Sequence, residues 1–289
     1  MSKIKLFTPV NIVKPDKTFS YESVISGIGS CFAQYVMEHF ENLGFSTAYN
    51  PNGIVYNASS IANSLDYITN DIEYSTTNFI KHNSLWHSWE HHGSFSSPDL
   101  SQLKSNINKT KSKFKHKLAE SDIFILTPSS SVVYCLSDPY TLTANCHKYP
   151  GKYFERKILS QSDNLTALSK SIECIKKINS NCQIIITLSP VRHYPGDLVL
   201  NTRSKANLIS AIHQCVDNFD KVEYFPSYEI LLDELRDYRF FNEDMLHPTD
   251  LARKIIFQKF ISTYFNEECQ TILVKKEKLL KSQYHRKKN

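Results

Sequence analysis

The strongest constraint on the fold is the alternation of short apolar runs with longer segments of helical periodicity. Five runs have the length and composition of strands: Ser23–Ile28, Phe45–Tyr49, Ile123–Thr127, Ile184–Leu188 and Lys221–Phe225. The helical segments between and after them are Cys31–Leu43, Ser59–Thr69, Pro98–Ala119, Asp163–Ile178, Ser204–Phe219, Tyr228–Leu235 and Pro248–Phe265. This alternation is typical of a parallel sheet covered by helices on both faces. We therefore expect a flavodoxin-like, three-layer α/β/α domain with a mostly parallel five-stranded sheet.

The length and charge of the chain suggest one domain with a basic extension. Residues 1–265 are expected to form a single α/β domain, interrupted by an insertion at about 70–97, where no clear periodicity appears. The net charge of +5 depends strongly on residues 275–289, which hold seven Lys or Arg and one Glu. Residues 266–289 therefore read as a basic, helical tail that is either solvated or in contact with an anionic surface. Because the rest of the chain is nearly balanced in charge, no nucleic-acid partner is expected.

Composition also excludes several other classes of protein. The amino-terminal residues lack the apolar core of a signal peptide, and no apolar run is long enough to span a membrane. The seven cysteines are scattered and never spaced as CxxC, which argues against a disulfide framework or a zinc ribbon. We expect a cytoplasmic protein with reduced thiols and no cofactor, whose oligomeric state the sequence leaves open.

The first candidate site is the turn after the first predicted strand, where Gly27 and Gly29 precede Ser30. Glycines allow a tight turn at the carboxyl end of a strand, and ligands bind at this edge of open α/β sheets. A serine at this turn would have its backbone N–H at a helix start, ready to stabilise an oxyanion. Serine is equally a favoured helix N-cap. A GxGxxG cofactor site is disfavoured because Phe32 stands where the third glycine is required.

The second candidate is the DxxH sequence of Asp244 and His247, with Pro248 at the start of the next predicted helix. At this spacing the carboxylate can fix the imidazole tautomer while the other ring nitrogen faces a nucleophile. Alone, the pattern also fits an ordinary surface turn. An early serine followed by a late DxxH is, however, the order of catalytic residues in SGNH/GDSL hydrolases.

The sequence resembles the GSCFA family, whose name is the pentapeptide from Gly29 to Ala33. The resemblance extends from about Gly29 to Phe260 through further blocks: 50–57 (NPNGIVYN), 88–92 (SWEHH), 145–148 (NCHK), 189–193 (SPVRH), 204–206 (SKA) and 233–240 (DELRDYRF). It implies an SGNH hydrolase-like fold and a catalytic triad of Ser30, Asp244 and His247. It also implies an oxyanion hole formed by the backbone N–H groups of Ser30 and Gly53, with Asn145 as the side-chain donor.

One departure affects the predicted oxyanion hole. The family usually carries a Gly-Thr-Ala run after the third strand, where this chain has Ser129-Ser130-Ser131. A β-carbon at Ser129 would narrow the pocket or prevent a close backbone approach.

Three further residues are candidates for substrate binding: His92, Arg192 and His193. His92 follows an HxxEH spelling that begins at His87 and matches the motif of inverted zinc proteases, which requires a helix. The short aromatic segment here fits a pocket wall better than a metal site, and no metal is expected. Arg192 and His193 follow the fourth strand and would suit an anionic or carbohydrate substrate, although an arginine paired with a structural carboxylate fits as well. Cys31 is a rival nucleophile at the same helix start.

These observations predict a serine-dependent ester hydrolase or O-acyltransferase. The substrate would be an acyl ester of a small molecule or a glycan, together with an acyl donor in the case of a transferase. A different class also fits: a catalytically inert SGNH-fold module that binds a glycan or a protein.

Overall fold

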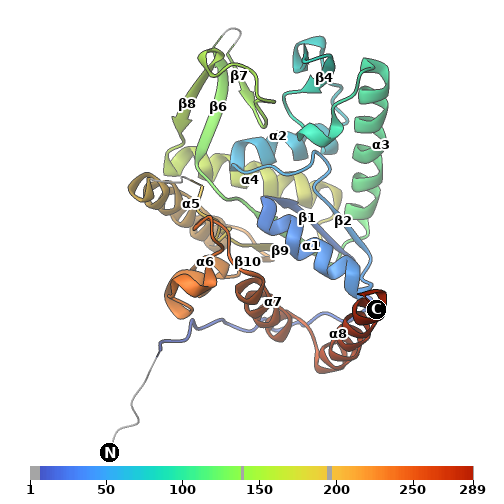
Figure 1. The fold of residues 1–289 in the computed structure, drawn as a ribbon, viewed down its shortest axis with the longest axis vertical. Coiled ribbons are helices and arrows are strands. Elements are labelled where there is room, and N and C mark those ends of the chain that lie inside the picture. Colours follow the sequence, from blue (N-terminus) through green and yellow to red (C-terminus); the bar gives the residue numbers. More distant parts are fainter. Residues whose placement is uncertain (1–6, 138–139, 194–196, 289) are drawn as a thin grey trace, which may run out of the picture.

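The central sheet has the predicted number of strands and is parallel. The computed structural model describes residues 7–137, 140–193 and 197–288 (Figure 1). Its five-stranded sheet has the order β10-β9-β5-β1-β2, and every neighbouring pair is parallel. The strands are β1 (Ile25–Gly29), β2 (Thr47–Tyr49), β5 (Ile123–Thr127), β9 (Gln183–Ile186) and β10 (Val222–Tyr224). Numbered within the sheet alone, this is the flavodoxin-like order 2-1-3-4-5, which confirms the predicted fold.

Helices cover both faces of the sheet and enclose two apolar clusters. One cluster joins the sheet to α2 (Ala58–Thr69), α3 (Leu100–Ala119), α4 (Gln161–Ile178) and α5 (Leu198–Asn218). The other joins it to α1 (Cys31–Leu43), α7 (Asp250–Tyr264) and α8 (Glu267–Lys288). Successive residues of β5 show why both faces are buried, since Phe124 belongs to the first cluster and Ile125 to the second. A strand buried on both faces reads as a continuous apolar run, and this is the signal that located it in the sequence.

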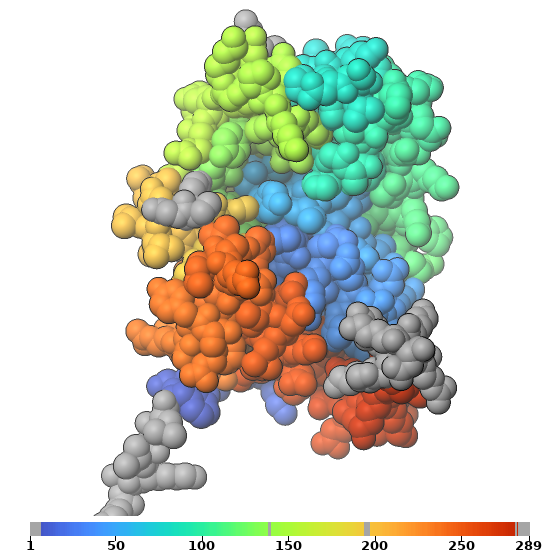
Figure 2. All heavy atoms as spheres, viewed as in Figure 1, coloured from blue at the N-terminus to red at the C-terminus, as the bar shows by residue number. Residues whose placement is uncertain are grey.

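Two small antiparallel sheets lie together at one end of the molecule (Figures 1 and 2). The hairpin of β3 (Phe79–His82) and β4 (Leu85–Ser88) lies inside the predicted insertion at 70–97. A three-stranded sheet of β6 (Val132–Ser137), β7 (Tyr140–Thr143) and β8 (Phe154–Ile158) has the order β7-β6-β8. This second sheet is absent from the sequence-based assignment. It follows β5 directly and so rises from the carboxyl edge of the central sheet.

Some element boundaries differ from the prediction. Helix α5 begins at Leu198 rather than Ser204, because the Asp197 side chain accepts the Leu200 N–H and caps an earlier start. The helix predicted at Tyr228–Leu235 is instead a single turn, α6 (Ser227–Glu229), followed by a π-helical turn, η4 (Ile230–Glu234). Short 3₁₀ turns are η1 (Thr76–Asn78), η2 (Gly93–Phe95), η3 (Gly151–Tyr153) and η5 (Tyr238–Phe240). Within the residues that the structure describes, none of the helices is both long and apolar enough to cross a membrane.

Candidate active site

Ser30 occupies the turn between β1 and α1, and its hydroxyl is fully buried. The preceding Gly29 has φ +149°, and a β-carbon there would lie 2.2 Å from the Thr127 carbonyl oxygen, so only glycine fits. The Gly29 N–H donates to Asn50 Oδ1 at 2.8 Å, which secures the turn. Ser30 stands at the N-cap position of α1, but its side chain makes no capping hydrogen bond. Its Oγ has no hydrogen-bond partner within the described part of the chain. The capping role that the sequence also allowed is therefore not how the hydroxyl is used.

Asp244 and His247 form a hydrogen-bonded pair in the loop that leads to α7. Asp244 Oδ2 lies 2.7 Å from His247 Nδ1, and its Oδ1 accepts the N–H groups of Leu246 and His247 at 2.8 and 3.0 Å. The two backbone hydrogen bonds, with the imidazole bond after them, lower the pKa of Asp244 to about 2. Met245 between them has φ +57°, which closes the turn. With Nδ1 engaged by the carboxylate, Nε2 of His247 is the ring nitrogen left for proton transfer.

The packing of α1 against α7 brings Ser30 and this pair to the same edge of the sheet. Arg253, early in α7, lies over the ring of Tyr35, early in α1, at 4.2 Å. Further along, the rings of Phe40 and Phe257 are 4.9 Å apart, so the two helices run in parallel. Ser30 directly precedes α1 and His247 closely precedes α7. Both therefore lie at the carboxyl edge, although the described residues include no hydrogen bond between Ser30 and His247.

The two predicted backbone oxyanion donors are hydrogen-bonded within the protein. The Ser30 N–H donates to the Thr127 carbonyl at 3.1 Å, and the Gly53 N–H donates to the Asn50 carbonyl at 2.8 Å. Gly53 has φ +76°, and a β-carbon there would lie 2.3 Å from His92 Cβ. Ser129, at the position of the family glycine, is buried, and its hydroxyl has no hydrogen-bond partner within the described residues.

Asn145 lines a cavity of about 280 Å³, whose lining includes His193 but none of the three triad residues. Its Oδ1 accepts the His147 N–H at 2.9 Å, which orients the amide so that Nδ2 remains available as a donor. The cavity lies between the start of α2, the β6–β7 hairpin and His193, and among the residues that the structure describes no Lys, Arg, Asp or Glu lines it. Its lining residues are Tyr56, Asn57, Ser130, Val132, Tyr134, Thr143, Ala144, Asn145, Cys146 and His193.

His193 connects this cavity with the Asp244–His247 loop. Its ring packs edge-on against Tyr56, with 4.6 Å between the ring centroids. Burial lowers the pKa of His193 to about 4, and the charges of Lys205 and His247 act in the same direction. The imidazole is therefore neutral near pH 7. Tyr56 and Tyr134 are cavity residues that the sequence-based assignment missed, although Tyr56 stands inside the NPNGIVYN block.

A family comparison covers most of the α/β domain. The model of the GSCFA family matches residues 24–260. The chain belongs to the GSCFA family. No curated protein sequence matches it.

Solved structures give only remote likenesses to this GSCFA protein. They include a family 3 carbohydrate esterase from Clostridium thermocellum, at 13% identity and TM-score 0.38 over 84% of this chain and 94% of that one. A family 2 carbohydrate esterase from Clostridium thermocellum, in complex with cellohexaose, has 9% identity and TM-score 0.40 over 87% and 65%. A lipase from a goat rumen metagenome has 9% identity and TM-score 0.40 over 85% and 99%. These identities and TM-scores are too low to transfer an activity.

Two of the residues predicted to bind substrate contact other parts of this GSCFA protein. Arg192 donates its backbone N–H to the Leu246 carbonyl at 3.0 Å, and its guanidinium lies over the Phe241 ring at 4.0 Å. The sequence allowed an arginine paired with a structural carboxylate. The contacts shown here are instead with a backbone carbonyl of the DxxH loop and with an aromatic ring. His92 packs on Gly53, and its Nδ1 accepts the Ser94 N–H at 3.2 Å.

The HxxEH segment of this family member is a strand followed by a turn, not a helix. Both ring nitrogens of His87 are hydrogen-bonded. Nδ1 lies 2.6 Å from Ser96 Oγ, and Nε2 lies 3.1 Å from the His82 carbonyl oxygen. His91 Nδ1 lies 2.8 Å from Ser88 Oγ. In the described residues no group of three or more His, Cys, Asp or Glu side chains is arranged to hold a metal ion. The segment joins the two small sheets, since the Trp89 carbonyl accepts the Ala144 N–H at 2.8 Å and His147 Nε2 lies 2.7 Å from the Ser88 carbonyl oxygen.

Cys31 does not have the environment of an activated thiol. Burial raises its pKa, and the opposing effects of nearby backbone N–H groups, Lys205 and Arg253 are smaller.

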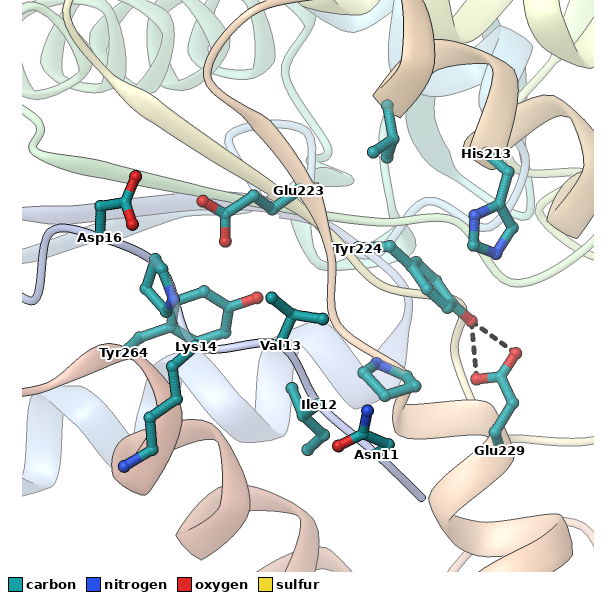
Figure 3. A pocket seen from close by; sticks show the side chains of 13 residues that line it. Asn11, Ile12, Val13, Lys14, Asp16, His213, Glu223, Tyr224, Glu229 and Tyr264 are labelled. Carbon is teal, nitrogen blue, oxygen red and sulfur yellow. Dashed lines mark hydrogen bonds between the residues drawn. The ribbon is translucent and has the colours of Figure 1, made fainter.

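A second cavity, of about 650 Å³, lies between residues 11–16 and the end of β10 (Figure 3). Its lining includes Glu223, Tyr264 and the hydrogen-bonded pair of Tyr224 and Glu229, and none of the predicted site residues lines it.

Proposed function

We propose that this GSCFA protein is a serine-dependent ester hydrolase or O-acyltransferase with Ser30, His247 and Asp244 as its triad. The observation that carries the proposal is the Asp244–His247 pair, in which the carboxylate accepts two backbone N–H groups and the imidazole Nδ1. Three hydrogen bonds fix both the carboxylate and the tautomer. The pair shares its edge of the sheet with a buried serine hydroxyl that has no other structural use.

In the proposed reaction, Ser30 Oγ attacks the ester carbonyl carbon while its proton passes to His247 Nε2. The tetrahedral intermediate then collapses, the alcohol leaves with the proton from His247, and an acyl-Ser30 ester remains. Water or an acceptor hydroxyl next attacks this ester, again giving its proton to His247. Collapse releases a carboxylic acid or a new ester and restores the Ser30 hydroxyl. Asp244 holds the imidazolium throughout.

Asn145 is the proposed side-chain donor to the oxyanion. Its Oδ1 is engaged by the His147 N–H, which leaves Nδ2 to donate toward the cavity. The Ser30 and Gly53 N–H groups would add to this only by leaving the Thr127 and Asn50 carbonyls that they now contact. A single removed oxyanion donor typically costs about 10² to 10³ in kcat.

The cavity beside Asn145 favours a neutral, hydroxylated substrate. Its described lining combines two tyrosine rings with amide and hydroxyl groups and holds no Lys, Arg, Asp or Glu. Aromatic faces and amide hydrogen bonds suit a sugar ring, whereas a phosphate or carboxylate would find no cation among these lining residues. An O-acylated glycan, or a precursor of one, is therefore the substrate class we propose.

Labelling with a fluorophosphonate tests the proposal directly. The probe is expected to attach to wild-type protein at Ser30, as located by peptide mass spectrometry, and labelling should be lost in Ser30→Ala and His247→Ala. Label on Cys31, or none on native protein, would contradict the proposal. Acetylated and unmodified oligosaccharides then separate hydrolysis from transfer, since only a transferase moves the acetyl group to an added acceptor.

The alternative function is a binding module without catalysis. The hydrogen-bonded N–H groups of Ser30 and Gly53 favour this second reading, because a preformed oxyanion hole keeps its donors free. It predicts no fluorophosphonate labelling but measurable binding of neutral oligosaccharide, weakened by Tyr134→Ala in the cavity.

A further inference from the structure

One face of α5 carries three buried polar side chains, Asn201, Ser204 and Lys205. Positions three and four apart lie on the same side of a helix, so these side chains point in one direction. Asn201 Oδ1 accepts the His193 N–H at 3.1 Å, and Ser204 Oγ accepts the Ser131 N–H at 2.8 Å. Lys205 Nζ donates to the Ser189 carbonyl at 2.6 Å. This face of α5 therefore contacts both loops that leave the carboxyl edge after β5 and β9.

Lys205 is the unusual member of the group. Only 1% of its surface is exposed, and no carboxylate lies within ion-pair distance of Nζ among the residues that the structure describes. Besides the Ser189 carbonyl, Nζ has the Tyr228 ring at 5.5 Å. Burial lowers the pKa of Lys205 to about 7. A buried lysine without a carboxylate is costly, and an apolar side chain of similar length would stabilise the fold better. Its contribution is therefore to be sought in function.

The loop that Lys205 contacts is joined in turn to the DxxH loop. Ser189 begins the segment 189–193, and Arg192 in that segment donates its N–H to the Leu246 carbonyl at 3.0 Å. The Arg192 guanidinium reaches the Met245 carbonyl at 3.4 Å. Leu246 and Met245 are the two residues between Asp244 and His247. Two hydrogen bonds therefore connect Lys205 with the DxxH loop: the first joins Lys205 to Ser189, and the second joins Arg192 to Leu246.

We propose that Lys205 is a positioning residue for the triad. By holding the Ser189 carbonyl it fixes segment 189–193, and through Arg192 this segment holds the Asp244–His247 pair at the edge where Ser30 lies. Lys205 is buried and does not line the cavity, so its proposed action runs through the Ser189 carbonyl. The inference rests on the proposed function for its kinetic consequence only, because the mechanical link between the two loops exists whatever the reaction.

The test replaces Lys205 by methionine, which keeps the length of the side chain and removes the donor and the charge. Lys205→Met should lower kcat for a short acyl ester by about 10-fold to 100-fold with little change in KM, since a displaced catalytic group loses rate more than binding. Thermal stability should stay the same or rise. Amide hydrogen exchange at 245–247 should become faster, while exchange within β1 and β5 stays unchanged.

The matched control is Ser26→Ala, at the opposite edge of the sheet. It removes the buried hydroxyl 2.6 Å from Ser121 Oγ, and Ser121 keeps its bond to the Lys117 carbonyl. This variant should leave kcat and the exchange at 245–247 as in the wild type. A Lys205→Met protein with wild-type kcat and wild-type exchange in that loop would overturn the proposal.

Two further outcomes remain decisive. If the wild type has no esterase activity, the proposed function fails, and the exchange at 245–247 alone decides the role of Lys205. If Lys205→Met does not fold, Arg192→Ala carries the test at a partly exposed position. A fall in kcat with unchanged KM and faster exchange supports the link, whereas a higher KM at unchanged kcat and exchange makes Arg192 a substrate contact and overturns it.

Discussion

At the scale of single residues, removing the hydroxyl of Ser30 should affect catalysis and the stability of the fold in different ways. It is buried and has no hydrogen-bond partner among the described residues, and such a group costs about 1 to 3 kcal/mol of folding free energy. Ser30→Ala should therefore leave the free energy of unfolding unchanged or raise it, while ester hydrolysis falls on the order of 10⁴-fold or more. Urea unfolding and initial rates on a short acyl ester measure the two effects. Cys31→Ala is the matched control, and the nucleophile would be reassigned if it alone removed activity.

Gly53 offers a second prediction at this scale. Its φ of +76° and the 2.3 Å approach of an added β-carbon to His92 Cβ make any side chain unfavourable. Gly53→Ala should lower the free energy of unfolding by at least about 1 to 2 kcal/mol, the usual cost of a left-handed conformation. Gly151→Ala serves as the control, because nothing lies within 4 Å of its added β-carbon. Equal effects of the two substitutions on the melting temperature would contradict this account of Gly53.

At the scale of elements, the sequence located what is buried on both faces and missed what is half-exposed. Strands β1 and β5 are buried at every residue and β9 at all but its first, whereas β8 presents three exposed residues out of five and gives no comparable run. The early start of α5 depends on the Asp197 cap, whereas the sequence-based assignment began this helix only at Ser204. Caps and surface strands depend on local hydrogen bonds and tertiary contacts, which periodicity does not report.

The candidate site shows the same division. Glycine and serine after β1, and the DxxH spacing, identified the residues that the fold gathers at one edge, because parallel strands end together. The hydrogen bonds of the Ser30 and Gly53 N–H groups, the stacking of Arg192 on Phe241 and the buried Lys205 were not predictable. Each depends on contacts between segments far apart in the chain. The triad and its oxyanion donors themselves stay predictions until the labelling experiment is done.

The DxxH loop is the element with its own prediction. Asp244→Asn keeps an Oδ1 that can accept the Leu246 and His247 N–H groups, so the loop should hold its shape, but the charge that orients the imidazole is lost. We expect kcat to fall by up to about 10⁴-fold. Because both residues serve one proton transfer, the double variant with His247→Ala should be no slower than His247→Ala alone. A double variant slower by the product of the two single effects would show that Asp244 and His247 act independently.

The wild-type protein should keep the Asp244 carboxylate ionised well below pH 4, since its pKa is about 2.

At the scale of the whole molecule, buried titratable groups around the small sheets set the dependence of stability on pH. Burial lowers the pKa of His91 to about 3 and that of His147 and His193 to about 4. All three therefore stay neutral in the folded protein while the unfolded chain takes up protons below about pH 6.5. Glu90 acts in the opposite direction. Burial raises its pKa to about 7, so the folded protein keeps a proton that the unfolded chain releases between about pH 4.5 and 7.

Three histidines against one carboxyl group predict a net loss of stability on acidification. Between pH 6.5 and 4.5 the free energy of unfolding should fall as the pH falls, because unfolding takes up more protons on these histidines than Glu90 releases. Glu90→Gln removes the opposing group and should make this fall steeper. His147→Asn removes one proton acceptor of the unfolded chain and should make it shallower. Urea unfolding of the three proteins at intervals of half a pH unit measures each slope. A wild-type free energy of unfolding that is flat or rises on acidification would mean that these imidazoles are already protonated in the native state, and that the histidines around the small sheets are hydrated rather than buried.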